Sequence, residues 1–138
     1  LAADPLKTYY PPAAKEPVPF LDFAELQNAL VHVDKAARTM SGLSDRKDLN
    51  AEQVSILNQV LYHAEQELLL TNGLPRRPWY KHAIYAPGFY TGYGVKTLPG
   101  IREAVEQRKW KEAQEEIHRT AMAISRFADY LENAAAKY

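Results

Sequence analysis

Eight residues in the last third of the chain recur at alternating steps of three and four. This spacing places all eight on one face of an α-helix over about residues 109–136. At a rise of about 1.5 Å per residue the helix is about 40 Å long, so other helices must cover its apolar face. The eight residues are Trp110, Ala113, Ile117, Thr120, Ile124, Phe127, Leu131 and Ala134.

An earlier segment has the same spacing and predicts a helix over about residues 22–41. Asp22 is the predicted N-cap, with Glu25 three residues later, and Gly42 is the predicted stop. The predicted inner face consists of Phe23, Leu26, Leu30, Val33, Ala37 and Met40.

A third segment predicts a helix over about residues 51–71, with a capping pair at Asn50 and Gln53 and an end at Asn72-Gly73. Its apolar surface is wider than one contact needs, because Ile56, Val60, Leu69 and Leu70 lie off its main apolar face. A shorter helix is expected to begin at Pro99. Four helices and no extended alternating pattern predict an all-α fold, most simply an antiparallel four-helix bundle.

The 138 residues carry 17 basic and 17 acidic side chains, so the chain is formally neutral. Neutrality argues against a nucleic-acid partner, because such binding depends on excess positive charge. No stretch is long and apolar enough to span a membrane. Five of the nine prolines lie in residues 1–19, which we interpret as an extended leader or an interdomain linker before residues 20–138.

The predicted connection over residues 73–98, between the second and third helices, is too long for an ordinary bundle loop and too aromatic for a disordered one. It contains six aromatic residues, four basic residues and no acidic residue, so the segment is +4 and the remainder is −4. Such a loop could grip an anionic ligand group. Packing of the aromatic rings onto the helices is the simpler interpretation and is favoured by composition alone.

Catalytic and metal-binding motifs are weak. The chain has no cysteine and no phosphate-binding or nucleophile motif. Glu115 and His118 form one E-x-x-H unit, but a di-metal bundle needs two such units, so an independent metalloenzyme is disfavoured. His82, among aromatic residues, is interpreted as a packing residue. We therefore expect no catalytic residue, no metal ligand and no cofactor in this chain.

Residues 74–87 read LPRRPWYKHAIYAP, and Tyr93 is followed by LPGI at residues 98–101. This pattern resembles the transferrin-receptor-like dimerisation domain of the glutamate carboxypeptidase II family, over roughly residues 18–136. The resemblance implies a C-terminal domain that forms a homodimer and follows a zinc-dependent peptidase domain, which supplies the catalytic residues and the zinc. It also implies that the 73–98 loop folds over the active site of that peptidase domain.

In that family a lysine and a tyrosine of the loop hold the substrate's carboxylates. The tyrosine matches Tyr93, whereas the lysine position is occupied by Gly92, so selectivity for glutamate is not transferred. Further possible loop contacts to peptide substrate are Gly92, Lys96, His82 and Arg77. The expected dimer or packing face consists of Ile56, Val60, Leu69, Trp110, Ile124 and Phe127.

The resemblance leaves one alternative open, a receptor-like protein that lacks peptidase activity and binds a macromolecule through its helices. Zinc ligands upstream of this chain would distinguish the enzyme from the receptor. In either case the family suggests an ectodomain of a membrane-anchored, secretory or vacuolar protein.

Overall fold

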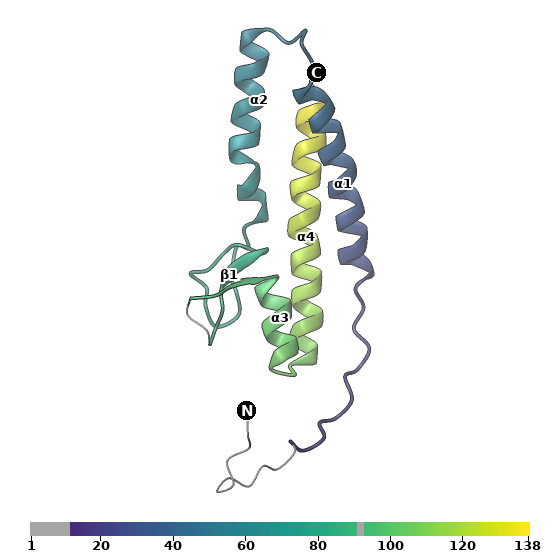
Figure 1. The fold of residues 1–138 in the computed structure, drawn as a ribbon, viewed down its shortest axis with the longest axis vertical. Coiled ribbons are helices and arrows are strands. Elements are labelled where there is room, and N and C mark those ends of the chain that lie inside the picture. The colour runs from purple at the N-terminus through teal and green to yellow at the C-terminus, as the bar shows by residue number, and fades with distance from the viewer. Residues whose placement is uncertain (1–11, 91–92) are drawn as a thin grey trace, which may run out of the picture.

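The computed structural model describes residues 12–90 and 93–138 and is mainly helical (Figure 1). Along the chain lie α1 (Ala24–Ser44), α2 (Ala51–Ala64), the short 3-10 helix η1 (Glu65–Leu68), β1 (Tyr85–Pro87), β2 (Val95–Thr97), α3 (Pro99–Glu106) and α4 (Trp110–Ala135). The predicted helical class is therefore confirmed. Within the described ranges, no helix is both long and apolar enough to cross a membrane.

Helix α4 is the central element, and α1 runs along it in the same direction (Figure 1). Near their starts the main chain of Asp22 bonds to the Gln114 side chain, and farther along both helices Lys35 pairs with Glu132 at 3.2 Å.

Helix α2 runs the opposite way (Figure 1). The Tyr130 hydroxyl donates to the Val60 carbonyl at 3.2 Å and the Tyr138 hydroxyl to the Gln53 carbonyl at 3.0 Å, so later residues at the C-terminus meet earlier residues of α2.

A simple up-and-down bundle is therefore not observed, since its first and last helices would run in opposite directions. The physical reason is the length of α3. Eight residues make a helix of about 12 Å, too short to return the chain along α4. The chain therefore starts α4 at the same end of the molecule as α1.

The core along the α1–α4 contact is built largely from small side chains. Ala29 and Ala36 of α1 share buried clusters with Ala121 and Ala128 of α4, respectively. This corrects the predicted inner face of α1, because Leu30 and Ala37 are exposed, whereas Ala29 and Ala36 are buried. The buried residues of α1 are Leu26, Ala29, Ala36, Met40 and Leu43.

Helix boundaries agree with the capping signals only in part. The Asn50 side chain accepts from the Gln53 main chain, and the Gln53 side chain accepts from the Asn50 main chain, both at 2.9 Å, which confirms this capping box. Gly42 does not stop α1, which continues to Ser44. The predicted second helix is shorter than expected, because the α-helix ends at Ala64 and η1 follows.

The predicted loop contains a small antiparallel hairpin. Tyr85 pairs with Thr97, Ala86 with Lys96 and Pro87 with Val95. At the start of the loop Gly73 has a φ of 64°, and an added Cβ would lie 2.3 Å from the Pro78 carbonyl oxygen. Glycine is therefore required at that turn.

Residues 12–19 of the predicted leader and the following residues 20–23 have no regular secondary structure, and residues 1–11 lie outside the described part. Phe20 is almost fully exposed, whereas the carbonyl of Glu16 accepts from the Arg108 guanidinium. This hydrogen bond ties part of the leader to the turn between α3 and α4.

Candidate functional site

The candidate site is the 73–98 loop, which is fastened to α3 and α4 by ion pairs. Arg76 pairs with Glu112, Arg77 with Glu103, and Lys96 with Glu106. Lys81 is exposed and has no carboxylate within 4.0 Å in the described ranges. Three of the four positive charges are thus used to dock the loop.

Arg77 is the centre of this docking. One guanidinium nitrogen donates to Glu103 and the other to the Pro87 carbonyl, both at 2.6 Å. The guanidinium also lies over the rings of Tyr80 and Phe89, at 5.3 and 5.2 Å from their centroids. The second oxygen of Glu103 accepts from the Phe89 main chain at 2.7 Å. Arg77 and Glu103 are 7% and 5% exposed, so Arg77 is not available to a ligand.

Arg76 makes a second, more exposed connection. Its guanidinium donates two bonds of 2.8 Å to the carboxylate of Glu112. The hydrogen bonds from Arg76 lower the pKa of Glu112. The pair joins the loop to the first turn of α4 and is partly screened by solvent.

A buried carboxyl supports the start of α3. Glu116 of α4 is buried, and an added Cβ on Gly100 would lie 2.2 Å from its Oε2 atom, which has no hydrogen-bond partner in the described residues. Its other oxygen accepts from Arg119, which also donates to the Gly73 carbonyl at 2.8 Å. Burial raises the pKa of Glu116.

Glu103 and Glu116 were missed by the sequence reasoning as structural residues. Both lie on helix faces that also contain buried apolar residues, and a charged residue at such a position was the available signal.

The tip of the hairpin is the exposed part of the loop. Tyr93 is fully exposed, and Tyr90 and Val95 are largely exposed. Trp79 is also 68% exposed. The aromatic residues are therefore divided between packing, which uses Tyr80 and Phe89, and a solvent-facing group. The predicted contact Gly92 lies outside the described residues.

His82 and Tyr85 form a stacked pair beside η1, with ring centroids 4.0 Å apart. The Tyr85 hydroxyl donates to Glu65 at 2.6 Å, and the His82 Nε2 atom is 3.3 Å from the same oxygen. The bond to Glu65 raises the pKa of Tyr85, and burial lowers the pKa of His82. His82 Nδ1 lies 3.2 Å from the Ile84 main-chain nitrogen, which donates to it, so this histidine fits the packing interpretation.

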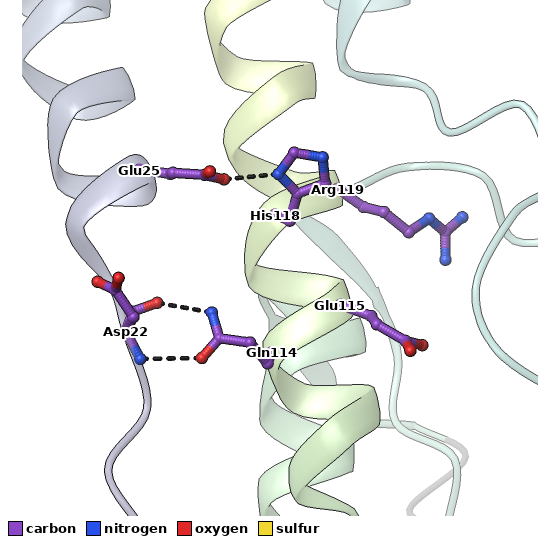
Figure 2. Close-up of a pocket in the computed structure, with 6 residues that line it drawn as sticks. All are labelled: Asp22, Glu25, Gln114, Glu115, His118 and Arg119. Carbon is purple, nitrogen blue, oxygen red and sulfur yellow. Dashed lines mark hydrogen bonds and ion pairs between the residues drawn. The ribbon is translucent and has the colours of Figure 1, made fainter.

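The E-x-x-H unit does not form one site. Figure 2 shows Glu115 and His118 pointing in different directions from α4. His118 Nδ1 lies 2.6 Å from Glu25 of α1, while Gln114 bonds to the main chain of Asp22. The unit therefore contributes one histidine to the α1–α4 contact, and Glu115 has a different neighbour, Lys111, at 3.8 Å.

The predicted dimer or packing face is divided between surface and interior. Ile56 and Leu69 are exposed, and Ile124 is buried in the chain's own core. The remaining members, Val60, Trp110 and Phe127, are partly buried. Ile56 and Leu69 are thus the members of this set that remain open to a partner.

Known proteins resemble this chain over most of its length. It is 35% identical over 111 residues to a probable glutamate carboxypeptidase of Arabidopsis thaliana, which covers 75% of this chain and 16% of the relative. It is 30% identical over 124 residues to a probable glutamate carboxypeptidase of Arthroderma benhamiae, and the match covers 88% of this chain and 17% of the relative. An inactive zinc metalloprotease of Schizosaccharomyces pombe is 29% identical over 113 residues, and the match covers 76% of this chain and 14% of the relative.

The chain thus spans about a sixth of the length of these relatives. The family model of the transferrin receptor-like dimerisation domain matches residues 21–132. This match begins just before α1 and ends within the last turns of α4, and so includes the docked loop and all the helices described above. The chain belongs to the transferrin receptor-like dimerisation domain family.

Proposed function

We propose that this chain is the homodimerisation domain of a glutamate carboxypeptidase-like zinc metallopeptidase, and that its 73–98 loop contributes to the substrate pocket of that protein. The chain itself supplies neither the zinc ligands nor the catalytic residues in this proposal. Two relatives named as probable glutamate carboxypeptidases support the choice of enzyme class.

The observation that carries the dimer proposal is the exposed apolar surface of α2. This helix buries only Leu57 and Ala64, whereas Val54, Ile56 and Leu61 each remain more than two-fifths exposed. Val54 and Leu61 lie two turns apart on one face of α2, whereas Ile56 lies on the other side of the buried Leu57 and Ala64. Neighbouring exposed apolar side chains such as Val54 and Leu61 are typical of protein interfaces. A twofold dimer would bury the same surface on both copies.

The dimer proposal is tested by light scattering of the 138-residue chain over a range of concentrations. Leu61→Glu places a charge in the proposed interface and should shift the protein to monomer, because an unpaired buried carboxylate is costly. Val31→Glu is the matched control, since Val31 is 71% exposed on α1. A monomer at all concentrations, or a dimer weakened only by Val31→Glu, would contradict the proposal.

The proposed substrate contact is Tyr93, whose side chain is free of the chain's own packing. Lys96 already pairs with Glu106, so Tyr93 is the better candidate for a substrate carboxylate. A hydroxyl bonded to a charged group contributes about 1.5–3 kcal/mol. Tyr93→Phe in the longer protein should therefore raise KM roughly tenfold or more, with kcat unchanged. Unchanged kinetics would show that Tyr93 does not bind substrate.

A second candidate function is that of a binding protein without peptidase activity. It is favoured by the relative from Schizosaccharomyces pombe that is named as an inactive zinc metalloprotease. Peptide hydrolysis and stoichiometric zinc in the longer protein distinguish the two. Hydrolysis that is lost on chelation supports the peptidase, whereas no hydrolysis and no zinc in the peptidase domain supports the binding protein.

A further inference from the structure

Three side chains with metal-binding atoms meet between α1 and α4, away from the 73–98 loop. They are His32 of α1 and Asp129 and Glu132 of α4, and one ligand atom from each lies within 4.8 Å of the other two. His32 Nε2 is 3.2 Å from Glu132 Oε2 and 3.8 Å from Asp129 Oδ1. The spacing of three residues on α4 places both carboxylates beside the same turn of α1.

These distances fit the coordination shell of a small divalent cation. Zinc binds histidine nitrogen and carboxylate oxygen at about 2.0–2.2 Å, so two ligands of a tetrahedral site lie about 3.3–3.5 Å apart. The 3.2 Å between His32 and Glu132 is slightly below this range and the 3.8 Å between His32 and Asp129 slightly above it, so small side-chain rotations bring both into the range. Three protein ligands with one open position are common in zinc sites.

We propose that His32, Asp129 and Glu132 form a surface zinc site that joins α1 to α4. The mixed set of one imidazole and two carboxylates favours zinc over magnesium, which prefers oxygen ligands alone. The site is accessible, because His32 and Asp129 line an open groove between the two helices. It belongs to this chain and does not depend on the proposed peptidase or on dimer formation.

The neighbouring charges leave the ligand atoms available. Lys35 contacts Glu132 through Oε1 at 3.2 Å, whereas Oε2 is the oxygen that faces His32. Lys35 nevertheless competes with a cation for the same carboxylate. His118, which lines the same groove, already lies against Glu25 and has no second carboxylate within 4.0 Å in the described residues.

The test is isothermal titration of the 138-residue chain with zinc chloride at neutral pH, with magnesium chloride as a second titrant. We expect one zinc per chain from this site and no magnesium binding there. His32→Gln and Asp129→Asn should each weaken zinc binding at least about tenfold, since even residues that only support a ligand have effects of this size. His118→Gln is the matched control and should leave the affinity unchanged.

Two further measurements sharpen the test. Lys35→Met should strengthen zinc binding, because it removes the competing cation. Circular dichroism of each variant checks that the helices are retained. Absence of saturable zinc binding, or an affinity that His32→Gln does not change, would overturn the proposal.

Discussion

Replacing Arg77 by methionine would remove the guanidinium that docks the loop. Glu103 would keep only the Phe89 main-chain donor, and its carboxylate would remain 5% exposed without a counter-charge. Breaking a buried ion pair in this way costs about 3–5 kcal/mol. Because domains of this kind are stable by about 5–15 kcal/mol, the loss would be a large part of the total.

Urea denaturation measures this effect, with circular dichroism following the helices and, in a Trp110→Phe background, Trp79 fluorescence following the loop. The double variant Arg77→Met with Glu103→Leu should lose clearly less free energy of unfolding than the two single variants lose in sum. The reason is that the double variant leaves no unpaired buried charge. Lys81→Met is the matched control and should change the free energy of unfolding by no more than about 0.5 kcal/mol, since Lys81 is exposed.

Two results would refute the reasoning. A loss below about 1 kcal/mol for Arg77→Met would mean that the pair does not hold the loop in solution. A loss of unfolding free energy in the double variant that equals the sum of the two single losses would mean that Arg77 and Glu103 act independently.

Three other predictions concern the same region. Trp79→Ala should cost no more than about 0.5 kcal/mol in a urea titration, because the ring is mostly exposed; a loss of 3 kcal/mol or more would show that it is buried. Gly100→Ala should destabilise by about 1–3 kcal/mol, since its Cβ would meet Glu116; unchanged stability would show that Glu116 moves freely. Burial raises the pKa of Glu116 in the folded state. The contribution of Glu116 to stability should therefore fall as the pH rises above the pKa that this side chain has in the unfolded chain. Glu116→Gln should remove that fall, and an unchanged pH profile would contradict the assignment.

Sequence reasoning predicted α4 well because eight regularly spaced residues determine its face, and six of them are fully buried. It was less accurate for α1, because the spacing analysis gave weight to large residues such as Leu30. The α1–α4 contact instead uses Ala29 and Ala36, whose small side chains suit a close approach. Small residues give a weak periodic signal, so this contact was not predicted.

The candidate site stays a prediction, but the structure shows that most of its positive charge is used to dock the loop. Excess positive charge in residues 73–98 suggested an open anion-binding loop, which was weighed against packing. Arg77 and its partner Glu103 are separated by 26 residues, and Arg76 and Glu112 by 36. Pairings between distant residues depend on the tertiary fold and leave no local pattern in the sequence.

The missed hairpin has a similar explanation. Strands of three residues are too short to show an alternating pattern. Their pairing is instead supported by docking, since the carbonyl of Pro87 in β1 accepts from Arg77 and Lys96 of β2 pairs with α3. Tertiary contacts therefore determine this element more than local preference does.

The central claim is that α2 forms the contact between two copies of this chain, and hydrogen exchange at low and high protein concentration tests it most directly. Helix α2 has few buried side chains, so its amides should exchange readily in the monomer. The account predicts that α2 amides become more protected as concentration rises, while those of α1 do not change. Protection that rises in α1 and not in α2, or that depends on concentration in neither helix, would contradict it.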